Sequence, residues 1–242
     1  MIRALVLFVC LAAPAGAETV RVFAAASLKG PLDRAVEAWA EATGHEAQVA
    51  YGGSATIARQ IDQGAPADLV LLASPLWADW LAERGFAGAE APVAYLSNRL
   101  VLIAPEPGAL DLTAEAVEAR LGDGRLAMGM SKVVPAGIYG RASLEALGLW
   151  DGVAERLAEM DNVRAALALV ALGEAPLGLV YRTDAEADGD VFVVADLPEE
   201  SHPAILYPLA LLSEAKPARA LYDYLQRPEG RAAFLAAGFL EP

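Results

Sequence analysis

The residues best suited to chemistry in this 242-residue chain are small or hydroxyl-bearing residues at the places where strands give way to helices. The clearest case is the stretch Val134-Pro135-Ala136-Gly137, which leads into a helical pattern over residues 141–148. Proline fixes φ and lacks an N–H group, so it suits the first turn of a helix. Ala136 and Gly137 then leave backbone N–H groups uncovered at the positive end of the helix. An ordinary loop-to-helix junction would look the same, but the stretch also predicts a site for an anion.

Three further segments repeat this design. Ser27 and Ser54 each follow a predicted strand and precede a predicted helix, and Val163 lies in the first turn of another helix. Tyr181 ends a strand and carries a phenol that can donate one hydrogen bond. Taken singly, each serine would cap its own helix and the tyrosine would pack in the core. Together with Ala136, however, these residues predict a cleft in which neutral donors surround one tetrahedral oxyanion.

Because all five residues are uncharged, the class of anion that they could bind is limited. A buried dianion is costly unless it is fully hydrogen-bonded. Molybdate and sulfate are fully deprotonated at neutral pH and need donors only, whereas phosphate keeps a proton and calls for an acceptor. Only Asp161 could supply a nearby carboxylate, and we expect it to cap the helix that begins with Val163. The pattern therefore favours an oxyanion other than phosphate.

Hydrophobic spacing places the elements that must position these residues. We expect strands at residues 19–26, 47–51, 68–73, 91–97, 100–104, 125–130, 177–181, 191–194 and 207–212. We expect helices at residues 32–44, 55–63, 76–84, 113–121, 136–148, 153–157, 163–172, 217–225 and 230–237. Such alternation indicates mostly parallel sheets covered on both faces. Chain crossings near 96 and 204 predict a first lobe (residues 18–96 plus 205–242), a second lobe (97–204) and a cleft between them.

The composition indicates a globular protein, and the formal net charge is −14. The chain has only three lysines, so it offers no basic stripe for nucleic acid or anionic lipid. A strongly acidic protein also repels small anions at long range. Any anion site must therefore work through short-range donors.

The first 17 residues read as a secretory signal. Arg3 forms a short basic region, residues 4–13 are apolar, and Ala15-Gly16-Ala17 is a small-residue cleavage site. The predicted cleavage after Ala17 removes Cys10, the single cysteine, and with it any disulfide. A lipid anchor at Cys10 is disfavoured because Val9 is bulkier than the small residue usual before such a cysteine. We expect an exported, periplasmic protein.

Five segments carry a resemblance to a known family: 23–28 (FAAASL), 54–61 (SATIARQI), 64–69 (GAPADL), 134–139 (VPAGIY) and 174–181 (EAPLGLVY). On these the chain resembles the periplasmic molybdate-binding proteins of ABC importers, over essentially the whole mature chain. The resemblance implies a two-lobed α/β type II periplasmic-binding-protein fold. It further implies molybdate or tungstate as ligand, delivered to a membrane permease. A monomer without a cofactor, without a nucleic-acid partner and without membrane insertion is expected.

The resemblance also assigns site residues. In that family two serines, the alanine of the Pro-Ala-Gly step, a valine at a helix start and a tyrosine hold the oxyanion, through its oxygens only. The corresponding residues here are Ser27, Ser54, Ala136, Val163 and Tyr181. Two departures affect loop geometry: Met130-Ser131 stands where relatives often have Asp-Pro, and Gly52-Gly53 predicts a more flexible second loop.

Other functions stay open at this point. A receptor for sulfate or another small oxyanion is the first alternative, because sulfate differs from molybdate chiefly in size. An extracytoplasmic serine hydrolase is a distant second, because Ser54 lacks the second glycine of a nucleophile elbow. Such an enzyme needs a base, and both His45 and His202 are expected at the solvated surface. A metal site at His202 with Glu199 and Glu200 matches no zinc spacing. Trp77 and Trp80 read as core residues.

Overall fold

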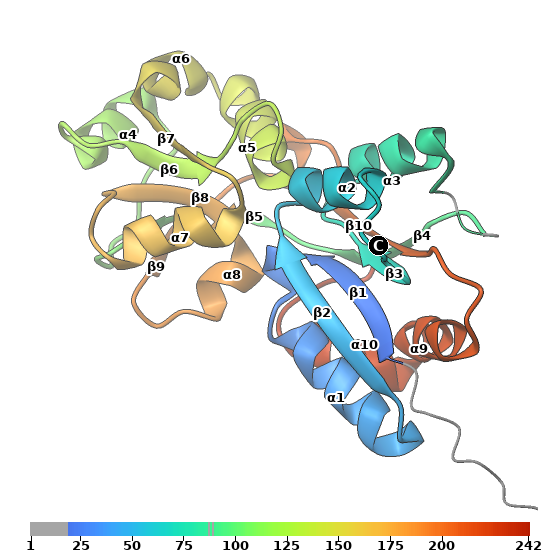
Figure 1. The fold of residues 1–242 in the computed structure, drawn as a ribbon. Coiled ribbons are helices and arrows are strands. Elements are labelled where there is room, and N and C mark those ends of the chain that lie inside the picture. The colour runs from blue at the N-terminus through green and yellow to red at the C-terminus, as the bar shows by residue number, and fades with distance from the viewer. Residues whose placement is uncertain (1–18, 87, 89) are drawn as a thin grey trace, which may run out of the picture.

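The computed structural model describes residues 19–86, 88 and 90–242, so the predicted signal peptide over residues 1–17 lies outside the described residues. Two five-stranded sheets, each flanked by helices, form two lobes that lie side by side (Figure 1). We call them the first lobe, built on the sheet that contains β1, and the second lobe, built on the sheet that contains β5. This arrangement confirms the predicted two-lobed α/β fold.

The first sheet has the strand order β2-β1-β3-β10-β4. Its strands are β1 (Thr19–Ala25), β2 (Glu46–Gly52), β3 (Leu69–Leu71), β4 (Val93–Ser97) and β10 (Leu206–Leu211). Its helices are α1 (Pro31–Thr43), α2 (Ser54–Asp62), α3 (Pro75–Leu81), α9 (Lys216–Gln226) and α10 (Pro228–Leu235), with the single turns η1 (Ala26–Leu28) and η2 (Ala82–Phe86). Leu69 and Leu71 pack with α1 and α9, whereas Val70 and Leu72 pack with α2 and α3. Side chains alternate between the faces of a strand, so this sheet needs cover on both faces.

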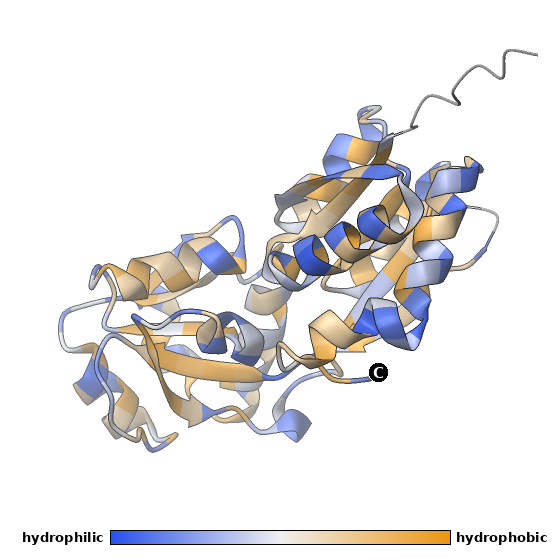
Figure 2. Ribbon diagram, turned by 90° about the horizontal axis from the view of Figure 1, so that it is seen from below, coloured by the Kyte–Doolittle hydropathy of each residue, from blue (hydrophilic) through white to orange (hydrophobic). Residues whose placement is uncertain are grey.

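The second sheet has the strand order β7-β6-β8-β5-β9. Its strands are β5 (Leu100–Ala104), β6 (Leu126–Gly129), β7 (Leu157–Met160), β8 (Leu177–Tyr181) and β9 (Phe192–Asp196). Its helices are α4 (Ala114–Leu121), α5 (Pro135–Ala146), α6 (Trp150–Val153), α7 (Val163–Ala171) and α8 (Arg182–Glu186), with the turns η3 (Ala154–Arg156) and η4 (Glu199–Ser201). The central strands β5 and β8 are buried along their whole length, and Figure 2 shows the apolar residues concentrated on the strands of both lobes.

Both sheets are mixed, where mostly parallel sheets were expected. β1 pairs parallel with β2 and β3, but β10 pairs antiparallel with β3 and β4. In the second sheet β6 pairs parallel with β7 and β8, but β5 pairs antiparallel with β8 and β9. The antiparallel strands β5 and β10 lie directly after the two chain crossings, between residues 97 and 100 and between 196 and 206. Strands joined by a helix in the same lobe pair in parallel through a right-handed crossover. A strand that enters from the other lobe has no such connection and can pair in the opposite direction.

One element was predicted wrongly. A helix was expected over residues 153–157 and no strand after it, but a helical turn at Trp150–Val153 and η3 end at Arg156, and β7 follows at Leu157–Met160. β7 is an edge strand of four residues with an exposed Glu159. It is too short and too polar to show the alternation that identifies a strand.

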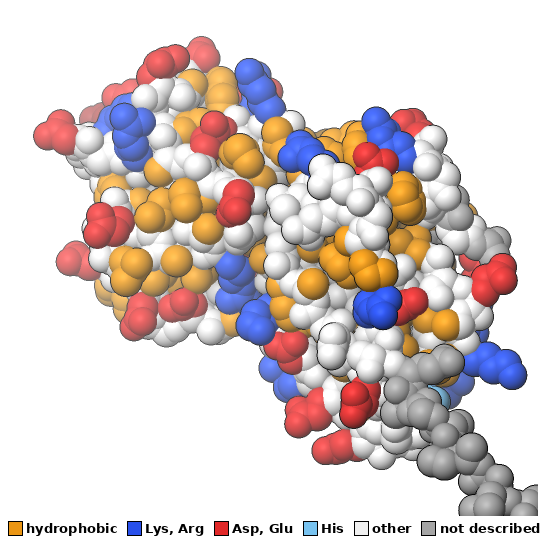
Figure 3. Space-filling model, in the orientation of Figure 1, with side chains coloured by type: hydrophobic (Ala, Val, Ile, Leu, Met, Phe, Trp, Pro, Cys, Tyr) orange, Lys and Arg blue, Asp and Glu red, His pale blue; other side chains and the backbone are white. Residues whose placement is uncertain are grey.

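The visible surface carries acidic side chains scattered over both lobes (Figure 3). Of the helices in the described part of the chain, none is long and apolar enough to cross a membrane.

Candidate anion-binding site

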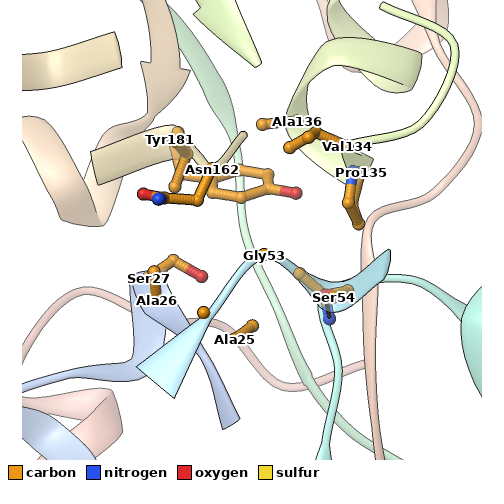
Figure 4. A pocket seen from close by; sticks show the side chains of 13 residues that line it. Ala25, Ala26, Ser27, Gly53, Ser54, Val134, Pro135, Ala136, Asn162 and Tyr181 are labelled. Atoms are coloured by element: carbon orange, nitrogen blue, oxygen red, sulfur yellow. Dashed lines mark hydrogen bonds between the residues drawn. The ribbon is translucent and has the colours of Figure 1, made fainter. Parts of the chain in front are cut away.

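A small cavity lies between the two lobes, where the ends of β1 and β2 face the starts of α5 and α7 (Figure 4). It is lined by 13 residues from both lobes: Ala25, Ala26, Ser27, Gly52, Gly53, Ser54, Ala73, Val134, Pro135, Ala136, Asn162, Val163 and Tyr181. All five site residues predicted from the sequence are among them. The cavity has a volume of about 10 Å³. This is room for a single compact group.

Two helices begin at the cavity without a side-chain cap. The residues before α2 and α5, Gly53 and Val134, make no side-chain hydrogen bond to the helix start. The first in-helix bonds run from the N–H of Ile57 to Gly53 and from the N–H of Ile138 to Val134. The earlier amides of each helix, including that of Ala136, are therefore left for a partner in the cavity. Both helices also present their positive ends there.

The start of α5 is held by very close packing. A Cβ atom at Gly137 would lie 2.1 Å from the carbonyl oxygen of Gly129 and 2.5 Å from that of Met130. Only a residue without a side chain lets the helix start sit this near the end of β6. Gly137 thus fixes the position of the neighbouring Ala136 amide.

The start of α7 differs from the prediction in one residue. Asn162, and not Asp161, is the N-cap, and its side-chain oxygen accepts a hydrogen bond from the N–H of Ala165 at 3.0 Å. Asp161 is exposed and accepts from the Asn162 amide at 2.7 Å. The Asn162 side chain thus accepts the N–H of the third residue of the helix. The N–H of Val163, the first residue, is left for a ligand in the cavity. Asn162 itself borders the cavity, and an Asp-Asn pair before an apolar run is the signal that could have identified it.

Ser27 does not stand at the start of a long helix, as was expected. It lies in the single turn η1, and α1 begins only at Pro31, after Gly30 with φ of 90°. The side chain is buried, and its Oγ lies 3.2 Å from the hydroxyl of Tyr207. In Figure 4 the hydroxyl of Ser27 faces the space beneath Tyr181. Ser27 therefore contributes its hydroxyl to the site but no dipole of α1.

The hydroxyls of Ser54 and Tyr181 are both free to donate. Ser54 Oγ accepts the N–H of Ala73 at 3.0 Å, so its own proton is left over. Tyr181 is buried, and its hydroxyl has no hydrogen-bond partner among the described residues. Burial, followed by the neighbouring Tyr207, raises the pKa of Tyr181 well above its usual value, so the phenol stays protonated. A buried phenol without a protein partner is suited to donate to a bound ligand.

Charged groups stay outside the cavity. Among the residues that the structure describes, no lysine, arginine, histidine or carboxylate borders it. His45 stacks on Trp39, and His202 is half-buried against Tyr139, where a solvated position was expected. Within 19–86, 88 and 90–242 no three His, Cys, Asp or Glu residues are grouped to hold a metal ion. The cavity therefore offers donors and neither a base for Ser54 nor metal ligands.

An ion pair lies just behind the site. Asp184, at the start of α8, is fully buried, and its Oδ1 lies 2.6 Å from Nε of Arg164 on α7. Burial raises the pKa of Asp184 to about 7, and the guanidinium of Arg164 opposes that rise. The pair ties the helix that follows Tyr181 to the helix that begins at Val163.

Contacts across the cavity bring the lobes together. The indole N–H of Trp77 on α3 donates to the carbonyl of Val133 in the second lobe at 3.0 Å. A Cβ atom at Gly53 would lie 2.2 Å from the carbonyl oxygen of Asp161. Gly53 has ordinary extended backbone angles, so a glycine is needed here for the space beside Asp161 and not for an unusual conformation.

Known proteins share this architecture. A family model described as bacterial extracellular solute-binding protein matches residues 20–240. The chain belongs to this family. It is 39% identical over 226 residues to the molybdate-binding protein ModA of Escherichia coli (strain K12), covering 91% of this chain and 88% of that protein.

Two further members of the family are similar over nearly their whole length. The molybdate-binding protein ModA of Haemophilus influenzae is 36% identical, covering 93% of this chain and 91% of that protein. The solved structure of the Azotobacter vinelandii periplasmic molybdate-binding protein superposes with a TM-score of 0.80 at 28% identity, covering 92% of this chain and 99% of that one.

Proposed function

We propose that this protein is a periplasmic receptor that binds molybdate or tungstate and delivers it to the permease of an ABC importer. Ser27, Ser54, Ala136, Val163 and Tyr181 hold the oxyanion through its oxygens. The lobes comprise residues 18–96 plus 205–242 and residues 97–204, and they close on the anion. The protein acts as a monomeric receptor and not as an enzyme, after cleavage of its signal peptide at Ala17.

One observation carries this proposal: a small cavity between the lobes offers hydroxyl and amide donors from both of them, and no charged residue of the described part of the chain lines it. Donors without a nearby acceptor suit a dianion that carries no proton. Helix starts supply part of the positive potential that lysine or arginine would otherwise provide. The similarity to the molybdate-binding relatives selects molybdate among such anions.

Calorimetric titration of ligand-free mature protein with molybdate, tungstate, sulfate and phosphate tests the proposal. We expect submicromolar binding of the first two and much weaker binding of sulfate. Tighter binding of sulfate would favour the sulfate receptor instead, and a preference for phosphate would contradict the proposal. Ester hydrolysis that disappears in Ser54→Ala would favour the hydrolase.

A further inference from the structure

A chain of hydrogen bonds between buried side chains runs from the crossing between the lobes to the cavity. Asn98 lies in the crossing between β4 and β5, and its amide nitrogen lies 3.3 Å from the hydroxyl of Tyr207 on β10. That hydroxyl in turn lies 3.2 Å from Ser27 Oγ. Asn98, Tyr207 and Ser27 are all at most 5% exposed, so water does not compete for these bonds. The chain thus links the hinge region to a residue that borders the cavity.

A backbone amide determines the orientation of the Asn98 side chain at the start of this chain of bonds. The N–H of Arg99 can only donate, and it lies 2.9 Å from Asn98 Oδ1, so that atom is the amide oxygen. The amide nitrogen of Asn98 therefore faces Thr183 Oγ1, at 2.8 Å, and Tyr207 Oη. It can only donate to both of them.

The amide of Asn98 favours one arrangement of the remaining protons. Tyr207 Oη accepts from Asn98 and keeps its own proton for a second partner, and Ser27 Oγ at 3.2 Å is placed to accept it. Burial, followed by the nearby carboxylate of Asp184, raises the pKa of Tyr207 far above its usual value, so that proton is always present. Ser27 Oγ then accepts from Tyr207, and its own proton is left to point into the cavity.

We propose that Asn98 and Tyr207 are positioning residues that fix Ser27 as a donor and thereby exclude oxyanions that carry a proton. This rests on the proposed function in taking the cavity as the site of an oxyanion. An anion such as hydrogen phosphate must donate its proton to an acceptor. A freely rotating serine could accept that proton, whereas a serine whose oxygen accepts from Tyr207 has one lone pair occupied and its own proton available for the ligand. Asp184, the nearest buried carboxylate, is paired with Arg164 and does not border the cavity.

The test compares sulfate with inorganic phosphate at about pH 8, where both are dianions and only phosphate carries a proton. Their affinities are measured by displacement of bound molybdate in a calorimetric titration. In Tyr207→Phe we expect the phosphate-to-sulfate affinity ratio to rise about tenfold, as for one hydrogen bond gained or lost at a charged group. Tyr95→Phe is the matched control, because this buried tyrosine donates to the carbonyl of Leu225 at 2.7 Å away from the cavity. It should leave the ratio unchanged.

A second variant covers the case that Tyr207→Phe does not fold. In Asn98→Asp the new carboxylate only accepts, so Tyr207 donates to it, Ser27 donates to Tyr207, and the oxygen of Ser27 faces the ligand. The added charge weakens the binding of both dianions alike, so the phosphate-to-sulfate affinity ratio should again rise.

An unchanged ratio in both variants, with the affinity for all anions weakened equally, would show that Asn98 and Tyr207 have only a structural role. Molybdate failing to bind the wild type while sulfate binds would contradict the proposed ligand, and direct titration of sulfate and phosphate would then measure the ratio. Failure of every oxyanion to bind would overturn both proposals.

Discussion

Among single residues, Ser54 illustrates how a hydroxyl is prepared for a ligand. Its oxygen accepts the N–H of Ala73, and its proton is therefore free on the cavity side. Tyr181 reaches the same result in another way, because its phenol is buried without a partner among the described residues and its proton is free to be donated.

Replacing Ser54 by alanine should weaken molybdate binding by about 1–3 kcal/mol, because a buried donor to a charged group is lost. Ser143→Ala is a suitable control: Ser143 is fully buried, but it is bonded to Ser201 at 2.6 Å and does not line the cavity. Calorimetry should show the loss only in Ser54→Ala. Equal affinities of Ser54→Ala and wild type would exclude Ser54 from the site.

The residue types at the site could be predicted from the sequence, but their hydrogen-bond partners could not. Ser27, Ser54, Ala136, Val163 and Tyr181 all line one cavity. The partners of the two serines, Tyr207 and the amide of Ala73, lie 180 and 19 residues away in the chain. No local pattern reports contacts that depend on how strands from distant segments are ordered in a sheet.

At the scale of helices and strands, Gly137 allows the start of α5 to pack against the end of β6. Replacement by alanine would force its Cβ against the carbonyl oxygens of Gly129 and Met130, both of them backbone atoms that move little. We expect a loss of about 1–3 kcal/mol in the free energy of unfolding, as for other overpacked sites. Urea unfolding measures it. Gly189→Ala, where nothing lies within 4 Å of the new Cβ, should cost much less. Similar losses in both variants would contradict the packing argument.

The link between α7 and α8 should make stability depend on pH. The pKa of Asp184 in the folded protein is about 7, above the value of about 3.9 in an unfolded chain. Between these values the folded state binds more protons than the unfolded state. The free energy of unfolding should therefore fall as pH rises from about 4 to about 7 and then level off.

Asp184→Asn removes this contribution, so its stability relative to wild type should rise over the same pH range. Urea unfolding at several pH values provides the comparison, with Asp79→Asn, an exposed position on α3, as the control for loss of a carboxylate. Parallel pH profiles for wild type and Asp184→Asn would show that the carboxyl group does not titrate as the burial predicts.

Most helices and strands follow from hydrophobic spacing, but the direction of strand pairing does not. The alternation of elements predicted the parallel pairs of β1 with β2 and β3. It could not reveal that β10 inserts between β3 and β4 in the opposite direction. That placement is decided by the return of the chain from the second lobe.

At the scale of the whole molecule, Gly53 determines how closely the first lobe can approach the second. A side chain there would meet the carbonyl oxygen of Asp161 in the other lobe. We expect Gly53→Ala to weaken molybdate binding roughly 5- to 150-fold, the equivalent of 1–3 kcal/mol of overpacking. Thermal unfolding of the ligand-free protein should change little, because the lobes can separate to relieve the clash.

Gly52→Ala is the comparison variant for this prediction. Gly52 also lines the cavity, but its new Cβ would meet the Ile57 side chain at 3.4 Å within the same lobe, so it reports a local effect without a clash between lobes. Calorimetry on both variants, with small-angle scattering to follow compaction on adding molybdate, separates closure from local loop effects. Equal affinities for the two variants would contradict a role for Gly53 in closure.

The position of β10 determines the order in which the two sheets can be completed during synthesis of the chain. The second sheet is complete once residue 196 has been made, but the first sheet lacks its penultimate strand until residues 206–211 emerge. The half of the molecule that is translated first is thus finished last: β3 pairs with β1 but keeps one open edge, and β4 has no partner strand, until the chain returns.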